Sequence, residues 1–279
     1  MVESFEINRI KSRPHLVDLQ RTFMPVNLIS ELTSKCNLRC TYCPKGDLNK
    51  DAWNGAPGRD MHMEDTALGR YLDLVRTLEF GQIQLSGVGE FSFRQDWVEV
   101  GKQIRDQTRS KITLVSNFAR IFSKEELDFL LSLFHIMVSI DTSDADLLKK
   151  VRKAVDIRTI TTNIINLRAR ALATGRAMPL IKINATIYAE NLRHIHELAC
   201  FAASVGVHIF QLARVGGLSE ANEFPHPITM ASAEDAAEAL RQMDLARVVC
   251  ANVRMQYTEV GDLRSELVRL SQPALGQAA

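Results

Sequence analysis

Cys36-Asn37-Leu38-Arg39-Cys40-Thr41-Tyr42-Cys43 follows directly on an apolar, strand-like run at residues 26–33. Its cysteines have the spacing C-x3-C-x2-C. Three thiolates this close in sequence can hold three irons of a four-iron cluster and leave the fourth iron without a protein ligand. An open metal position separates a site that binds a further molecule from a closed structural site. We therefore predict that Cys36, Cys40 and Cys43 are metal ligands.

Two other interpretations of the triplet stay open at this point. Zinc could take the three cysteines with a fourth ligand such as His62, although structural zinc sites usually pair two short cysteine knuckles and this sequence has no second one. The cysteines could also be ordinary buried side chains. A non-enzymatic protein that binds zinc or an iron–sulfur cluster is therefore a further hypothesis.

The bulk composition excludes several functional classes. The chain has 279 residues, 46% hydrophobic content and a formal net charge of +1, so it can bury a large core and shows no bias toward nucleic acid or anionic membranes. The first six residues lack the basic start and apolar core of a signal peptide, and no window approaches the ~18 apolar residues of a membrane span. Five cysteines, three of them clustered, do not form a disulfide framework. We expect a soluble cytoplasmic protein.

Apolar runs with strand character alternate along the chain with segments of helical periodicity. Such alternation predicts parallel strands joined by right-handed helical crossovers. Glycine and polar residues recur at the carboxyl ends of the strands, the edge that carries the active site in parallel α/β folds. Six strand-then-helix units are expected. The predicted strands are 26–33, 82–88, 111–116, 135–140, 180–188 and 207–213, and the predicted helices are 63–80, 97–105, one opening at Ser123, 158–173, one capped by Asn191, and 231–246.

The cysteine motif, with the aromatic Tyr42 before its third cysteine, resembles that of radical S-adenosylmethionine (SAM) enzymes. Gly87-Val88-Gly89-Glu90 after the second strand, Val115-Ser116-Asn117 and Val138-Ser139-Ile140-Asp141 also fit. The resemblance covers roughly residues 25–215. It implies an α/β fold, a partial TIM-like barrel of six βα units, that binds one [4Fe-4S] cluster and SAM. SAM would chelate the open iron through its amino and carboxylate groups and be cleaved to a 5′-deoxyadenosyl radical.

The resemblance also implies roles for individual residues. Gly87 and Gly89 would let the backbone approach the methionine part of SAM, and Glu90 would accept from its ammonium group. Tyr42 would pack near the adenine. Hydroxyl, amide and carboxylate groups at later strand ends would contact the ribose or the carboxylate of SAM: Ser116, Asn117, Ser139 and Asp141. Three further polar strand residues are candidates to face the barrel lumen: Asn184, Gln211 and Arg214.

The reaction class depends on the cysteines outside the triplet. A dehydrogenase of this type would use an auxiliary cluster to take up a second electron, and only Cys200 and Cys250 remain for one. A thiol can instead return a hydrogen atom to the substrate radical from the opposite face, which inverts a stereocentre. Cys250, past the sixth helix, could lie over the barrel mouth and is the predicted donor, with Tyr257 as its rival. Cys200 is expected to be a core residue.

These features resemble the small radical SAM epimerases of aminoglycoside antibiotic biosynthesis. The resemblance implies an isomerase acting on an aminosugar carbon, with an external flavodoxin-like, ferredoxin-like or artificial electron donor. A radical SAM dehydrogenase of an amino-sugar or aminocyclitol, or a peptide-modifying radical SAM enzyme, is the alternative. We expect an N-terminal segment (1–24), the barrel (25–246) and a C-terminal extension that closes the barrel mouth (247–279). A polycationic substrate should meet carboxylates in loops and in the extension, and the candidates are Asp144, Asp146, Glu220, Glu223, Glu259 and Asp262.

Overall fold

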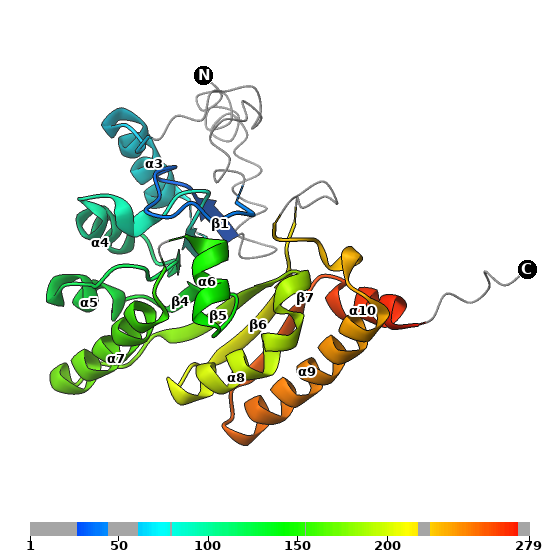
Figure 1. The fold of residues 1–279 in the computed structure, drawn as a ribbon. Helices are drawn as coiled ribbons and strands as arrows, with labels where there is room; N and C mark the ends of the chain where they lie inside the picture. Colours follow the sequence, from blue (N-terminus) through cyan, green and yellow to red (C-terminus); the bar gives the residue numbers. More distant parts are fainter. Residues whose placement is uncertain (1–26, 44–60, 79, 154, 217–223, 273–279) are drawn as a thin grey trace, which may run out of the picture.

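The computed structural model describes residues 27–43, 61–78, 80–153, 155–216 and 224–272. Within them, seven parallel strands form one sheet in the order in which they occur along the chain, which confirms the α/β class and the parallel topology (Figure 1). The strands are β1 (Asn27–Ser30), β2 (Gln82–Leu85), β3 (Lys111–Ser116), β4 (His135–Ser139), β5 (Leu180–Ile187), β6 (Ile209–Arg214) and β7 (Gln256–Val260). Because every neighbouring pair is parallel, all strand carboxyl ends meet at one edge of the sheet.

Helices connect successive strands and line the outer face of the curved sheet (Figure 1). They are α3 (Asp65–Thr77), α4 (Trp97–Gln107), α5 (Lys124–Leu130), α6 (Ala145–Arg152), α7 (Ile157–Thr174), α8 (Ile195–Ser204), α9 (Ala233–Asn252) and α10 (Leu263–Ser271). Short 3₁₀ turns occur at η1 (Phe91–Phe93), η2 (Ala189–His194) and η3 (Ile228–Met230). No described helix is both long and apolar enough to cross a membrane.

Local sequence signals explain where these helices begin and end. Ser123 and Glu126 form the predicted capping box at the start of α5, each side chain bonding to the other's backbone. Gly175 ends α7 with a left-handed φ of 64°, a conformation that glycine adopts without a Cβ penalty. These boundaries therefore follow from residue chemistry.

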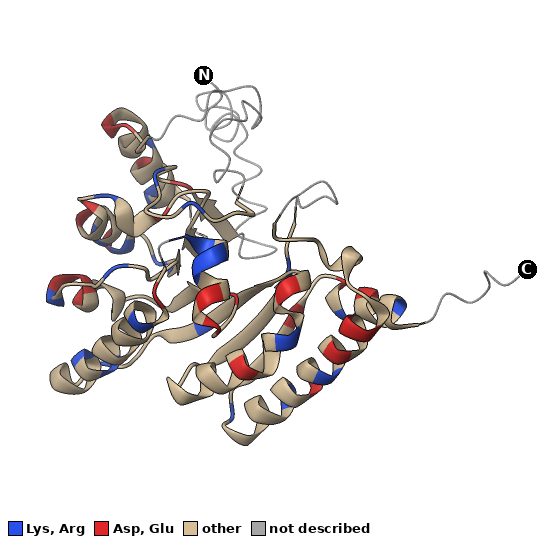
Figure 2. Ribbon diagram, viewed as in Figure 1, with Lys and Arg blue, Asp and Glu red and all other residues tan. Residues whose placement is uncertain are grey.

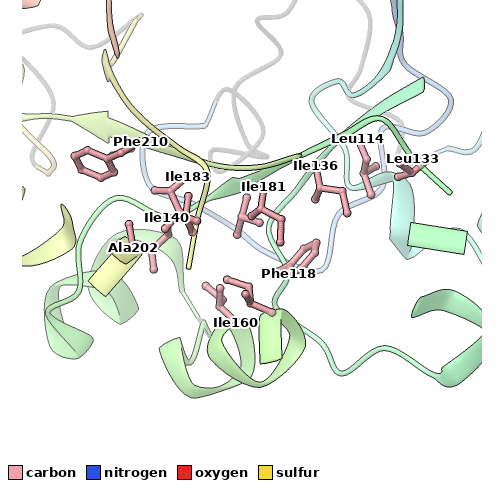
Figure 3. Close-up of a cluster of buried hydrophobic side chains, with 14 of the residues drawn as sticks. Leu114, Phe118, Leu133, Ile136, Ile140, Ile160, Ile181, Ile183, Ala202 and Phe210 are labelled. Atoms are coloured by element: carbon pink, nitrogen blue, oxygen red, sulfur yellow. The ribbon is translucent and has the colours of Figure 1, made fainter. Parts of the chain in front are cut away.

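Alternating residues separate the two faces of the sheet. In β4 and β5 the fully buried members, such as Ile136, Ile181 and Ile183, point toward the helices, where they pack with Ile160 of α7 (Figure 3). The intervening residues of these strands point to the opposite face, the barrel lumen, and most of them are half-buried. The period of two along each strand thus fills the core on one side and lines the lumen on the other.

Three elements were not predicted from the sequence. Helix α6 follows β4, and β7 with α10 adds a seventh strand-helix unit to the expected six. In addition, α9 continues to Asn252, so the boundary expected at residue 246 falls inside a helix. The segment after it begins as part of the sheet, since β7 pairs along its length with β6.

Candidate active site

The three predicted cysteines lie in one loop after β1. The N–H of Leu38 donates to Sγ of Cys36 over 3.4 Å, and the N–H of Cys43 donates to the carbonyl of Cys40 over 3.1 Å. Each of the three thiols is half-buried and outside any disulfide. The loop therefore brings three thiol ligands to the edge of the sheet where all strands end.

The donor set fits a multi-iron cluster better than a single zinc ion. In the part of the chain that the structure describes, no three His, Cys, Asp or Glu side chains converge closely enough to hold one metal ion. In a four-iron cluster each thiolate binds its own iron, so the sulfurs need not converge on one point. The proposed fourth zinc ligand, His62, pairs its Nδ1 with Oγ1 of Thr33 at 2.8 Å.

The ends of β2 and β3 hold the cysteine loop. Glu90 donates its N–H to the carbonyl of Lys35 over 2.8 Å. Asn117 donates from Nδ2 to Oδ1 of Asn37 over 2.8 Å, and the same nitrogen lies 3.9 Å from Sγ of Cys36. Two strand ends distant in sequence thus fix the first turn of the loop.

The carboxylate of Glu90 is largely used within the protein. Its Oε1 accepts from the N–H and the hydroxyl of Ser92, and its Oε2 accepts from the N–H of Asn117 over 2.8 Å. A carboxylate has about four acceptor positions, so one is left for a further donor. Glu90 therefore ties β2 to β3 and keeps limited capacity for the predicted ammonium contact.

The two glycines of this segment are explained by contacts inside the chain. A Cβ on Gly89 would lie 2.2 Å from the carbonyl oxygen of Thr33 and 2.7 Å from that of Lys35. A Cβ on Gly87 would lie 2.5 Å from the side chain of Glu31, whose Oε1 accepts from Val88. At position 89 only glycine lets the backbone before the first cysteine pass this closely.

A buried ion pair lies beside the second cysteine. Arg152 donates from Nε and a terminal guanidinium nitrogen to the two carboxylate oxygens of Asp141, each over 2.8 Å, and the side chains are 6% and 0% exposed. Tyr42 donates its hydroxyl to Oδ2 over 2.9 Å, and Thr186 donates its N–H to Oδ1 over 3.1 Å. Protein donors thus occupy about four acceptor positions of Asp141, so the carboxylate keeps none for the predicted contact with SAM.

The last turn of α6 holds the second half of the loop. The carbonyl of Val151 accepts from the N–H and the hydroxyl of Thr41, over 2.8 and 3.2 Å, and the carbonyl of Arg152 lies 3.9 Å from Sγ of Cys40. Burial raises the pKa of the Cys40 thiol to about 12, while the Arg152 guanidinium acts in the opposite direction. A bound metal would supply the further positive charge that a thiolate needs here.

The remaining predicted SAM contacts occupy different surroundings. Tyr42 lies with its ring 6.3 Å from that of Tyr188 and under the Arg152 guanidinium, and burial raises the pKa of its phenol. Ser139 is half-buried on the lumen face. Ser116 instead points to the helical face and is 1% exposed, with its hydroxyl accepting from the N–H of Phe118. In this position the Ser116 hydroxyl is turned away from the lumen, where SAM was expected to bind.

The structure also corrects the predicted hydrogen donor. Cys250 lies in the last turns of α9, 1% exposed, and its carbonyl accepts from the N–H of Met255 just before β7. This is the amino-terminal edge of the strands, opposite the cysteine loop. Burial raises the pKa of its thiol to about 11. Cys250 does not lie over the barrel mouth, because α9 continues as a helix to the edge of the sheet at which the strands begin.

The rival donor, Tyr257, faces the helical side as well. It shares the register position of Phe210, and its ring lies 6.2 Å from the Phe210 ring and 5.2 Å from the guanidinium of Arg247 on α9. Neither predicted donor is therefore directed into the lumen. Cys200, expected in the core, is exposed on α8, with Sγ 3.6 Å from Nε2 of His196.

Three of the four candidate carboxylates that the structure describes have partners of their own. Glu259 is paired with Arg247 and Arg264, Asp262 lies 3.7 Å from Arg214, and Asp144 caps α6 through the N–H of Leu147. Asp146 lies in the exposed first turn of α6. Glu220 and Glu223 lie outside the described residues.

Two residues important to the arrangement were not singled out from the sequence. Arg152 ends the basic run Lys149-Lys150-Val151-Arg152, which is typical of a solvated helix face. Lys182 lies in the strand Leu180-Ile181-Lys182-Ile183, where strict alternation was the available signal. Alternation predicts that Lys182 lies on the opposite face from Ile181 and Ile183, and in the structure this is the lumen face.

Comparison with known proteins agrees with this geometry. The family model described as the radical SAM superfamily matches residues 30–210. The chain is 24% identical over 175 residues, 63% of its length, to a probable GTP 3′,8-cyclase of Methanocaldococcus jannaschii. It is 26% identical over 190 residues, 68% of its length, to a PqqA peptide cyclase of Methylobacterium nodulans. These matches cover 54% and 46% of the two relatives, so the chain spans about half the length of the curated relatives it matches.

Solved structures share the fold at low identity. Streptococcus suis SuiB bound to S-adenosylmethionine has a TM-score of 0.65 and 16% identity, with 96% of this chain and 58% of that chain covered. The enzyme anSMEcpe with bound AdoMet has a TM-score of 0.60 and 16% identity, with 84% of this chain and 63% of that chain covered. Both likenesses support the arrangement of strands and helices.

Proposed function

Because the chain belongs to the radical SAM superfamily, whose members use a [4Fe-4S] cluster and SAM, we propose that it removes a hydrogen atom from a peptide substrate. In this proposal Cys36, Cys40 and Cys43 hold the cluster. The observation that carries it is the loop itself: three thiols at the carboxyl edge of a parallel barrel, fixed by contacts from β2, β3 and α6.

When bound, the cluster and SAM supply a 5′-deoxyadenosyl radical that takes hydrogen from the substrate. The chain's own residues position and shield that chemistry. Asn117 and Arg152 border the cysteine loop, and Glu90 keeps one acceptor position for the ammonium group of SAM. Gly87, Gly89, Tyr42 and Ser139 remain the proposed neighbours of the cofactor at the strand ends.

A peptide is favoured over an aminosugar by the charge of the lumen. No residue that faces the lumen in the seven described strands is acidic, and most charged side chains lie on the helices (Figure 2). An aminoglycoside carries several positive charges and would need carboxylates there. The relatives described as PqqA peptide cyclases are consistent with a peptide substrate.

Aminoglycoside epimerisation is the second candidate, since few cysteines lie outside the triplet. It now requires a hydrogen donor other than Cys250 or Tyr257, because both side chains are directed away from the lumen. A dehydrogenase acting on an amino-sugar would need an electron acceptor beyond this chain's described site.

The two candidates are separated by one assay. The reconstituted full chain is given SAM, a chemical reductant, and either a panel of unrelated peptides or a panel of aminoglycosides, and 5′-deoxyadenosine is measured. We expect a peptide to accelerate its formation over the substrate-free rate. If only an aminoglycoside accelerates 5′-deoxyadenosine formation, and a carbon of the product is inverted, the peptide proposal is wrong and the epimerase is the function.

A further inference from the structure

A hydrogen-bonded network of polar side chains crosses the lumen face of β5 and β6. Lys182 donates from Nζ to Oε1 of Gln211 over 3.1 Å, and Gln211 donates from Nε2 to Oδ1 of Asn184 over 2.7 Å. Asn184 stands in register with Ser139 on one side and with Gln211 on the other, and Gln211 is in register with Thr258. Four neighbouring strands therefore present polar groups at one level of the lumen.

Lys182 determines which groups donate and which accept in this network. Because an ammonium group only donates, it fixes the carbonyl end of the Gln211 amide toward itself. The amide nitrogen of Gln211 then donates to the side-chain carbonyl oxygen of Asn184. The Nδ2 group of Asn184 is left as a donor at the level of the Ser139 hydroxyl, and Lys182 keeps two N–H groups. The lumen thus presents donors without matching acceptors.

No carboxylate balances this lysine among the residues that the structure covers. Gln211 is the one hydrogen-bond partner of its ammonium group there, and burial lowers the pKa of Lys182. Nearby, Nε2 of His135 and Oγ1 of Thr258 are buried without a partner in the described chain. A half-buried cation and unsatisfied donors are stabilised when an anion lies against them.

We propose that Lys182 and Asn184, oriented by Gln211, bind a carboxylate of the substrate. This inference rests on the proposed radical chemistry and adds the substrate's chemical class: a peptide that carries an acidic side chain or a free carboxyl terminus. The carboxylate lies within the lumen, and the carbon that loses hydrogen lies nearer the cysteine loop.

The backbone of Lys182 lies deeper in the barrel than the edge at which SAM would chelate the open iron, and Asn184, in register with Ser139, lies between the two. Thr186 bonds Asp141 at the edge beside the cysteine loop, and Lys182 precedes it by four residues on β5. At about 3.3 Å per strand residue, the lysine Cα lies roughly 13 Å deeper. The carboxylate of SAM would stay at the edge, because there it chelates the open iron.

The first test needs no turnover. The full chain is treated with acetic anhydride, and the rate of acetylation of each lysine is followed by peptide mass spectrometry. Glutarate should slow acetylation of Lys182, and the neutral analogue glutaramide should not. Lys111, exposed at the other end of the barrel, is the internal control. An unchanged rate at Lys182, or an equal effect at Lys111, would overturn the site.

The second test uses pairs of peptides that differ only by Glu or Gln at one position, and it measures how efficiently each peptide drives the formation of 5′-deoxyadenosine. The acidic peptide should be preferred by about tenfold or more in kcat/KM, the discrimination expected of a charged hydrogen bond. Lys182→Met should lose that preference while keeping the iron content of the parent. Lys182→Arg should retain part of it, and Lys111→Met all of it.

The outcomes distinguish the two proposals. If no peptide accelerates 5′-deoxyadenosine formation, the peptide function fails, and protection by glutarate still decides whether the anion site exists. If Lys182→Met weakens SAM binding in equilibrium dialysis without peptide, the carboxylate is the cofactor's and the substrate assignment is overturned. Equal efficiency of the acidic and amide peptides in the parent protein overturns it as well.

Discussion

Arg152 binds Asp141 through two hydrogen bonds of 2.8 Å, and its backbone carbonyl faces the thiol of Cys40. One residue therefore joins the end of β4, through its side chain, to the cysteine loop, through its main chain. Tyr42 adds a second link from the loop to the same carboxylate. The ion pair therefore supports the loop through contacts with Cys40 and Tyr42.

We expect Arg152→Gln to lower the free energy of unfolding by ~3–5 kcal/mol, because it leaves the buried Asp141 carboxylate without its counterion. Iron bound after anaerobic reconstitution should fall with it. Urea unfolding and iron analysis measure the two effects. Arg158→Gln, which breaks an exposed pair with Asp156, is the matched control and should change neither. Full iron retention in a folded Arg152→Gln protein would contradict the role of the pair.

Serine at Cys36, Cys40 or Cys43 should abolish most iron and sulfide binding, because each thiolate is expected to hold a different iron. Cys200→Ser, on the exposed face of α8, should leave both unchanged. Chemical analysis and the visible absorption of the reconstituted proteins provide the measurement. Bound zinc without iron in the parent protein would speak for the zinc alternative.

Gly89→Ala should destabilise the protein by about 1–3 kcal/mol, since its Cβ would lie 2.2 Å from a backbone carbonyl that cannot move without displacing the cysteine loop. Gly87→Ala should cost less, because its Cβ meets the flexible Glu31 side chain. Gly69 of α3 has open space around it, and Gly69→Ala should stabilise by about 0.5–1 kcal/mol. Thermal or urea unfolding of the three variants gives the order, and a reversed order would refute the packing argument.

Stability should fall as the pH drops from about 6.5 toward 4. Burial, with Lys182 and His208 nearby, lowers the pKa of His135 from 6.5 to about 4. In this window the unfolded chain takes up a proton at this position that the folded chain does not, so protonation favours unfolding. His135→Gln should flatten the pH dependence of the urea midpoint between these values. An unchanged slope would show that other groups control it.

Cys250→Ala should leave the reaction unchanged, because the thiol is buried at the edge of the sheet opposite the cysteine loop. Both 5′-deoxyadenosine and the modified product are measured once a substrate is in hand. Loss of product with continued 5′-deoxyadenosine formation would restore Cys250 as the hydrogen donor.

The sequence predicted what depends on local pattern. Lys111–Ser116 was predicted to the residue, and the start of α5 and the stop at Gly175 follow from capping chemistry. The cysteine loop and the strand ends beside it were also predicted. Helix α6 was missed, because its eight residues follow a polar turn and carry a basic run.

Long-range packing decided what the sequence could not. Asp141 has the residue type of a SAM contact, but its role changes because Arg152 lies eleven positions later on a helix that turns back to it. The position of Cys250 depended on where α9 ends, and helix boundaries are poorly specified by propensity. Whether a strand residue faces lumen or helices followed from register, as Ser116 and Tyr257 illustrate.

Three cysteines within eight residues suggest a site that a short peptide could form, and the contacts around them argue otherwise. Asn117 reaches the loop from 81 positions away in sequence, Asp141 from 99, and the carbonyls of Val151 and Arg152 from 110 and 112. Contacts of such sequence separation form only after most of the barrel has closed. Metal insertion should therefore come late in folding, and a chain truncated before α6 would present the same three thiols without the walls that retain a cluster.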